Sequence, residues 1–196
     1  DSEAEEFYDE VKRSAEAGID GLIVQDLGGL LIARAAVPDM PLHGSTQMTV
    51  HTPLGAEFAK KLGICRIVPA RELTLDEIRK ICETGMETEV FVHGAQCMCL
   101  SGQCYMSAVI GSRSANRGQC AQACRLPFSA VGKPAEEYAL SLKDMSLVRH
   151  VDELCDIGCA SFKIEGRMKR PEYVAAAVTA LRNAVDGTGD TDADMK

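Results

Sequence analysis

The feature that most constrains the fold is a unit that recurs along the chain. Each copy is a helical stretch, a glycine, a few linking residues and then an apolar strand, and the glycines are Gly18, Gly63, Gly85 and Gly158. Glycine after a helix readily adopts the left-handed conformation that ends it. Helices that alternate with strands through short links are typical of parallel βα units. We therefore expect an α/β protein built on a parallel sheet.

The recurring helix–glycine–strand pattern predicts where most of the helices and strands lie. Apolar runs bounded by turn residues predict strands at 21–26, 41–46, 66–70, 88–94 and 160–166. Helical periodicity predicts helices at 2–17, 29–36, 52–62, 74–84, 144–156 and 170–185. Thr52 and Asp144 are predicted N-caps, Thr74 with Glu77 forms a predicted capping box, and residues 129–141 have room for a short hairpin.

The number of strands decides between two architectures. Five predicted strands fall short of the eight in a closed (βα) barrel, so we expect a partial TIM-like (βα) barrel. An open doubly wound sheet is the alternative, but no G-x-G-x-x-G follows any predicted strand. We expect one incomplete barrel-like domain over 1–186, with a cysteine-rich insertion at 93–128. Residues 187–196 are predicted to be a disordered acidic tail.

Composition narrows the class of protein. The chain has 196 residues, of which 46% are hydrophobic, and its formal net charge is −8. It has no apolar run that would span a bilayer and no signal peptide, so we expect a cytoplasmic protein with no membrane partner. Nine cysteines are an odd number for a disulfide framework, and in a reducing compartment clustered cysteines more often bind metal or do redox chemistry.

Most of the candidate metal-binding residues lie in the stretch from His93 to Phe128. Five cysteines lie in it, at positions 97, 99, 104, 120 and 124, and no acidic residue occurs between Glu89 and Glu136. The same window carries Arg113, Arg117 and Arg125. Thiolates among fixed positive charges and glycines suit a metal centre of negative net charge.

The cysteine spacing predicts a metal site without naming the metal. Cys97, Cys104, Cys120 and Cys124 follow the pattern C-x6-C-x15-C-x3-C. Four thiolates complete either a tetrahedral zinc site or an iron–sulfur cluster. Cys99 is a spare candidate ligand, and unrelated buried thiols are the plain alternative. The four remaining cysteines, at positions 65, 82, 155 and 159, fall in helices or beside strands and are interpreted as core packing.

A nucleophilic enzyme is the rival class. His93 is close in sequence to several cysteines, and a Cys–His pair can activate a thiolate. Neither a G-x-S-x-G elbow nor an H-E-x-x-H zinc helix is present, so this hypothesis rests on proximity alone.

Polar residues also follow the predicted strands, where sites on βα barrels lie. They are Gln25, Asp26, Thr46, Gln47, Arg71, Glu72, His93, Lys163, Glu165 and Arg167. Strand ends leave the core in any protein, so each single residue has an ordinary explanation as well.

Several long motifs resemble one family. The run FVHGAQCMCLSGQCYMSAVIGSRSANRGQCAQACRLPF is similar to the most characteristic region of the peptidase U32 family, the collagenase-like proteases. SLKDMSL and SFKIEGRMKRPEYV resemble a second block of that family, and LHGSTQ and VPARELTLDEI also match its pattern. The resemblance covers the chain except its acidic tail. It implies a TIM-like barrel whose first βα units precede Asp1, with further domains in the full-length chain.

The resemblance also implies an activity. Family members are named as peptidases of unknown catalytic type, while others hydroxylate transfer RNA, ribosomal RNA or a ubiquinone precursor. Those relatives hold a 4Fe-4S cluster on four cysteines that match Cys97, Cys104, Cys120 and Cys124, and prephenate is linked to the RNA reactions. The GRSANRGQCAQACRLPF form looks most like the ribosomal RNA type. No protease nucleophile of the family maps onto this sequence.

These observations together give a hypothesis for the site. We expect an iron–sulfur-dependent hydroxylase whose partner is a transfer or ribosomal RNA, with a collagenase-like peptidase as the alternative. Arg113, Arg117 and Arg125 are predicted to offset cluster charge and to hold an anionic cosubstrate or phosphate. His93, Glu165 and Arg167 are the candidates for substrate positioning or proton transfer.

Overall fold

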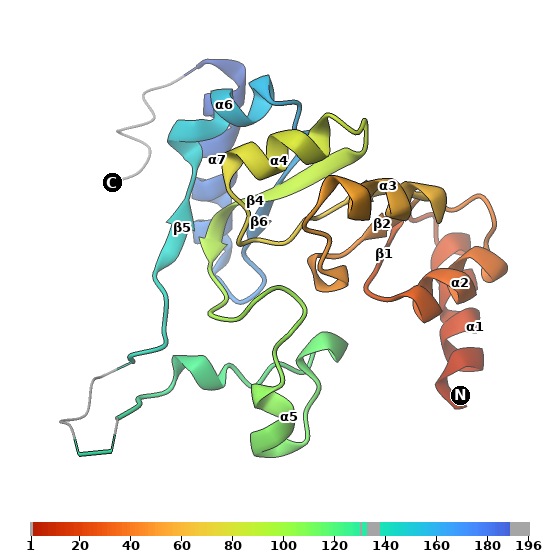
Figure 1. The fold of residues 1–196 in the computed structure, drawn as a ribbon, viewed down its shortest axis with the longest axis horizontal. Helices are drawn as coiled ribbons and strands as arrows, with labels where there is room; N and C mark the ends of the chain where they lie inside the picture. The colour runs from red at the N-terminus through yellow and green to blue at the C-terminus, as the bar shows by residue number, and fades with distance from the viewer. Residues whose placement is uncertain (1, 130, 133–137, 189–196) are drawn as a thin grey trace. The chain divides into compact units, whose positions relative to one another are not determined.

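A computed structural model describes residues 2–129, 131–132 and 138–188. The chain forms two compact units, one from Asp1–Glu89 with Gly158–Ser161, the other from Val90–Ile157 with Phe162–Lys196. Among the described residues (Figure 1) the α-helices are α1 (Ser2–Glu16), α2 (Leu27–Ala36), α3 (Pro53–Lys61), α4 (Leu75–Cys82), α5 (Met106–Gly111), α6 (Val151–Asp156) and α7 (Pro171–Asp186). The strands are β1 (Leu22–Val24), β2 (Leu42–Gly44), β3 (Ile64–Ile67), β4 (Glu87–Ala95), β5 (Asp144–Ser146) and β6 (Ser161–Glu165).

The first unit carries the parallel part of the sheet. β1 pairs with β2, β2 with β3, and β3 with the start of β4, and all three pairings are parallel. A helix lies between each consecutive pair of these strands in the chain. The α/β class with parallel βα units is therefore confirmed. No closed barrel forms among the described residues, and the partial barrel stays a prediction.

The four glycines and the caps at Thr52 and Thr74 behave as predicted. Gly18, Gly63, Gly85 and Gly158 all have positive φ, between 71° and 87°, which ends the preceding helix. The Thr52 side chain accepts a hydrogen bond from the amide of Gly55 at the start of α3. Both halves of the capping box form at the start of α4: Thr74 accepts from the Glu77 amide, and Glu77 accepts from the Thr74 amide.

One strand of the first unit begins earlier than predicted. β3 spans Ile64–Ile67 instead of 66–70, because its ladder with β2 starts at Leu42 and Ile64. The apolar run beyond it stays buried, and the Val68 amide still donates to the Gly44 carbonyl at 2.8 Å. The first part of this apolar run is therefore paired as a strand, and the part after Ile67 is buried without belonging to the strand.

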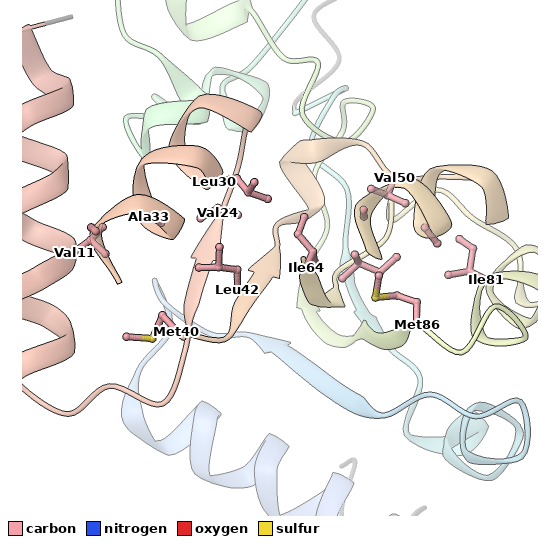
Figure 2. Close-up of a cluster of buried hydrophobic side chains, with 14 residues drawn as sticks. Val11, Val24, Leu30, Ala33, Met40, Leu42, Val50, Ile64, Ile81 and Met86 are labelled. Atoms are coloured by element: carbon pink, nitrogen blue, oxygen red, sulfur yellow. The ribbon is translucent and has the colours of Figure 1, made fainter. Parts of the chain in front are cut away.

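An apolar cluster fills the space between the helices and strands of the first unit. Figure 2 labels Val11 of α1, Leu30 and Ala33 of α2, Leu42 of β2, and Ile64 of β3 among its members. Leu42 and Ala33 are 0% exposed. Burying one such leucine side chain contributes about 2 kcal/mol relative to leaving it in water.

The second unit contains a strand where the sequence predicts a helix. Residues 144–146 form β5, which pairs antiparallel with β4 so that His93 lies opposite Ser146. The prediction that Asp144 caps a helix to Asp156 is therefore wrong. The sequence Asp-Met-Ser-Leu alternates polar and apolar residues, as a strand does, and the edge of β4 accepts it. The helix is the shorter α6, and it begins only at Val151.

The C-terminal elements agree with prediction. β6 pairs with β4, α7 begins with Pro171 in its first turn, and α6 packs against α7. The predicted hairpin at 129–141 and the tail at 187–196 extend outside the described residues. Among the helices that the structure describes, none combines the length and the apolar character that crossing a membrane requires.

Candidate functional site

His93 lies near the end of β4 and faces the start of α7. Its ring lies 5.4 Å, centroid to centroid, from the ring of Tyr173, and the two planes are inclined by 49°. The histidine is half-buried. Of the three predicted catalytic residues, His93 is the one whose side chain contacts other polar residues of the second unit in a defined geometry.

Tyr173, which contacts this histidine, belongs to a small polar network around Asp144. The Lys169 ammonium donates to an Asp144 carboxylate oxygen, and the Tyr173 hydroxyl donates to the same oxygen at 2.8 Å. The Lys169 nitrogen also lies 4.7 Å from the centroid of the Tyr173 ring. We name His93, Asp144, Lys169 and Tyr173 the His93 network. It links β4, β5 and the start of α7.

Three members of this network are not identified by the sequence analysis. The sequence pattern places Asp144 at a helix cap, and Lys169 and Tyr173 enter only as part of a family-like motif. Lys169 lies in the turn before α7 and Tyr173 lies in its first turn, so no helical spacing in the sequence relates the two. The antiparallel pairing that brings Asp144 to them cannot be seen in the sequence.

Electrostatics within the network favour a neutral histidine beside an ion pair. The hydrogen bond from Lys169 holds the pKa of Asp144 below its ordinary value, although burial opposes it. Burial lowers the pKa of His93, an effect that Asp144 opposes and Lys169 reinforces. Burial, with the hydrogen bond to Asp144, raises the pKa of Tyr173 to about 12. At neutral pH the site thus offers a neutral imidazole that can accept a proton.

Glu165 and Arg167 lie where β6 ends and the turn to α7 begins. Gly94, next to His93, has φ +112°, and a Cβ atom there would lie 2.2 Å from the carbonyl oxygen of Glu165. This close approach of two backbones brings the main chain of Glu165 to the end of β4. The Glu165 residue is half-buried, while Arg167 is exposed. Side-chain roles for both remain predictions.

Segment 93–128 is held together mainly by polar contacts. The Asn116 side chain donates to the Gly102 carbonyl at 2.9 Å, and the Ala121 amide donates to the Ser107 hydroxyl at 3.0 Å. Ser107 and Ser101 are both buried. These contacts fold the segment back on itself around the short helix α5.

Arg125 ties this segment to the residues that lead into β5. Its guanidinium donates to the Ser141 hydroxyl at 2.8 Å and to the carbonyls of Leu142 and Gln96. Its positive charge also helps to lower the pKa of Asp144. Arg125 therefore has a structural role as a brace. Arg113 and Arg117 are exposed, and a cosubstrate role for the three arginines remains a prediction.

The cysteine thiols of the segment fall into two neighbouring groups. Burial is the main cause that raises the pKa of Cys124; the Arg125 charge opposes this rise, and Cys97 and Cys120 reinforce it, so these three sulfurs influence one another. Burial, then the charge of Cys104 and a hydrogen bond with it, raise the pKa of Cys99, and Cys97 contributes as well. Cys97 and Cys120 are exposed, and Cys104 and Cys124 are half-buried.

The donor set fits a thiolate-bound metal in its chemistry. Like-charged thiolates raise one another's pKa, and a cation among them removes that repulsion. In the residues that the structure describes, no three His, Cys, Asp or Glu side chains are gathered closely enough to hold a metal ion. Cys97 influences the pKa of both Cys99 and Cys124, and the role of Cys97, Cys104, Cys120 and Cys124 as ligands stays a prediction.

With this geometry in hand, the comparison with known proteins decides the family. Residues 1–195 match the family model described as Peptidase family U32. The chain belongs to peptidase family U32. The resemblance seen in the motifs of this U32 chain is therefore confirmed.

Named relatives of the U32 chain fall into two groups. It is 43% identical over 177 residues to the 23S rRNA 5-hydroxycytidine C2501 synthase of Escherichia coli (strain K12), covering 87% of this chain and 27% of that protein. It is 36% identical to the tRNA hydroxylation protein P1 of Bacillus subtilis (strain 168), covering 91% of this chain and 45% of that protein. A protein named Collagenase, from Porphyromonas gingivalis (strain ATCC BAA-308 / W83), is 31% identical, with 93% and 49% covered.

The U32 chain is thus shorter than these relatives, since it spans between 27% and 49% of their length. No solved structure matches it.

Proposed function

We propose that the chain is part of an enzyme that hydroxylates a base of ribosomal or transfer RNA. The observation that carries the proposal is the Arg125 brace. It fastens the cysteine segment, at Gln96, to the residues that lead into β5, where Asp144 and the His93 network lie. A thiol-rich segment fixed beside a proton-handling network suits redox chemistry on a bound base. The relatives named for RNA hydroxylation support the same conclusion.

In this proposal Cys97, Cys104, Cys120 and Cys124 hold a 4Fe-4S cluster. When bound, such a cluster supplies one-electron transfer. Arg125 lies directly after Cys124, and its positive charge offsets the net negative charge of a thiolate-bound centre. Cys99 competes with Cys97 for the role of first ligand, since Cys104 influences the pKa of half-buried Cys99, whereas Cys97 is exposed.

The chain's own residues have separate tasks. His93, kept neutral by its half-buried position, accepts a proton from the base that reacts. Lys169 and Tyr173 hold the Asp144 carboxylate in place beside it. The arginines at positions 113 and 117 of the cysteine segment bind RNA phosphates or the carboxylates of an anionic cosubstrate such as prephenate. Glu165 and Arg167 position the substrate at the end of β6.

A peptidase is the second candidate, because one relative bears the name Collagenase. In that case a cysteine thiolate activated by His93 attacks the peptide carbonyl. Exposed Cys97 would be the nucleophile, and the reaction would need no bound iron. The two candidates therefore differ in their dependence on metal.

The test uses the full-length protein, purified without oxygen. Iron and sulfide content are measured first, and nucleosides from RNA incubated with the protein are analysed by mass spectrometry. We expect Cys104→Ala to lose both iron and hydroxylated nucleoside, whereas Cys155→Ser, at an exposed cysteine of α6, keeps both. Comparing Cys97→Ser with Cys99→Ser identifies the first ligand by which variant loses iron.

Two outcomes would overturn the proposal. One is hydroxylated nucleoside made at the full rate by protein that contains no iron. The other is gelatin cleavage by iron-free protein that disappears in His93→Ala or Cys97→Ser, which would establish the peptidase instead.

A further inference from the structure

Two cysteines far from the candidate metal ligands in the sequence meet in the first unit. Cys82 is the last residue of α4, and Cys159 lies in the link Gly158–Ser161 that leads into β6. The Cys159 thiol has the largest influence on the pKa of Cys82, so the two side chains lie within interaction range of each other. The neighbouring backbones are close as well: a Cβ atom on Gly158 would lie 3.9 Å from the Cβ of Cys82. Tertiary structure thus creates a dithiol from two cysteines that the sequence alone assigns to core packing.

The backbone around both cysteines is anchored. The Ala160 amide, next to Cys159, donates to the Thr88 carbonyl of β4 at 2.9 Å. On the other side, α4 ends in a turn in which the Gly85 amide donates to the Cys82 carbonyl at 2.9 Å. The thiol pair therefore lies between two hydrogen-bonded pieces of backbone, which favours a reproducible approach of the two sulfurs.

The chemistry of Cys82 suits attack on a disulfide. The hydrogen bond from Cys159, with a weaker one from Thr88, lowers the pKa of Cys82 to about 6, although burial and the Glu83 carboxylate oppose this. This shift favours the thiolate of Cys82, and the thiolate is the nucleophilic form of cysteine. Both cysteines are half-buried, so a small reagent has access to them.

We propose that Cys82 and Cys159 are a reversible thiol–disulfide pair, a redox site separate from the cysteines of segment 93–128. The oxidant is a low-molecular-weight disulfide. The Cys82 thiolate attacks one of its sulfurs, a mixed disulfide forms, and the first small thiolate leaves. Cys159 then gives its proton to solvent and attacks the Cys82 sulfur, which releases the second small thiolate. Two protein thiols are oxidised, and one small disulfide is reduced to two thiols.

Closing this bridge has a structural consequence. The bond would join α4 directly to the link before β6, and the enclosed loop contains β5, α6 and the whole cysteine segment. A cross-link across so long a loop restricts the unfolded chain strongly. Oxidation is therefore expected to raise the melting temperature of the first unit, where both ends of the bridge lie.

The experiment treats the full-length protein with oxidised glutathione in the absence of oxygen, alkylates the remaining thiols and identifies cross-linked peptides by mass spectrometry. We expect a peptide pair joined through Cys82 and Cys159, removed by dithiothreitol, in the wild type and in Cys155→Ser. Cys159→Ser should accumulate glutathione on Cys82 at neutral pH. Cys82→Ser should modify Cys159 at least about tenfold more slowly.

Treatment of the wild-type protein with oxidised glutathione is enough to overturn the proposal. The proposal fails if glutathione accumulates on exposed Cys155 or Cys65 while Cys82 and Cys159 stay reduced and alkylable. It also fails if Cys82 is modified but no cross-linked peptide forms. Iron content, measured in parallel, should stay the same in Cys82→Ser, so the outcome is independent of the proposed cluster.

Discussion

The strands and helices of the first unit and segment 93–128 are built on different physical principles. The first unit encloses a continuous cluster of buried apolar side chains from α1, α2, β2, β3 and α4. In segment 93–128, which the structure describes in full, Ala123 is the one buried apolar side chain beyond the end of β4, and Ser101 and Ser107 are buried with it. Large apolar residues are exposed there: Met98, Leu100, Tyr105, Met106, Val109, Ile110 and Leu126.

The difference means that the first unit supplies most of the folding stability, whereas segment 93–128 carries the residues proposed for the chemistry. Apolar burial is the main favourable term in folding, and the continuous cluster of buried side chains supplies it in the first unit. The cysteine segment depends on a few hydrogen bonds, on the Arg125 brace and, in our proposal, on bonds between thiolates and iron. A segment of this kind can be altered by its ligand while the framework around it stays folded.

The largest effect that we expect comes from Gly94, where β4 leads into the cysteine segment. Gly94→Ala places a Cβ atom 2.2 Å from the Glu165 carbonyl oxygen, at a φ of +112° that alanine tolerates poorly. We expect a loss of about 4 kcal/mol in the free energy of unfolding, measured by urea denaturation. Gly111→Ala is the matched control, since a Cβ there meets nothing within 4 Å. Equal losses in both variants would contradict the close approach of β4 and β6.

The next largest effect is expected from shortening a buried apolar side chain of the first unit, compared with an exposed one of segment 93–128. Leu42→Ala empties a site that is 0% exposed in the core of the first unit. We expect it to lower the free energy of unfolding by about 3 kcal/mol, because the lost apolar contacts and the cavity that remains each destabilise the folded state. Val109→Ala in α5, where the side chain is 83% exposed, should change it by less than about 0.5 kcal/mol. A comparable loss for Val109 would mean that the segment has an apolar core of its own.

A smaller and more local effect is expected at the Arg125 brace. Arg125→Ala removes the hydrogen bonds to Ser141, Leu142 and Gln96. We expect the segment to lose about 2 kcal/mol of local stability, seen as faster amide hydrogen exchange at residues 97–124. Amides of β1–β3 should exchange as before. Arg113→Ala, at an exposed arginine of the same segment, is the control and should leave exchange unchanged.

The smallest effect is a pH dependence carried by Asp144 and Tyr173. Because the fold raises the pKa of Tyr173 to about 12 from 10.0, its contribution to stability is present below pH 10.0 and is lost as the pH rises toward 12. The fold lowers the pKa of Asp144 from 3.8, so that contribution is lost as the pH falls below 3.8. Ultraviolet titration of tyrosinate should therefore lose its most alkaline phase in Tyr173→Phe. An unchanged titration curve in that variant would contradict the Asp144–Tyr173 hydrogen bond.

Local sequence signals predict the framework well because their physical causes are local. Gly63 and Gly85 end helices by adopting positive φ, and Thr74 with Glu77 starts one by pairing with nearby amides. These interactions span a few residues, so the sequence contains all the partners. Local signals do not predict β5, because a three-residue strand is stable only when it pairs with another strand. Its partner is β4, and the paired residues His93 and Ser146 are far apart in the sequence.

The sequence by itself determined the α/β class, the βα order of the first unit, the family and the cysteine spacing. Periodicity, glycine positions and motif residues are all properties of neighbours in the chain. Only the tertiary structure decided that Asp144, Lys169 and Tyr173 meet beside His93, that Arg125 braces Gln96 against Leu142, and that Cys82 meets Cys159. Each of these contacts joins residues distant in sequence, and their pairing follows from how the strands and helices pack.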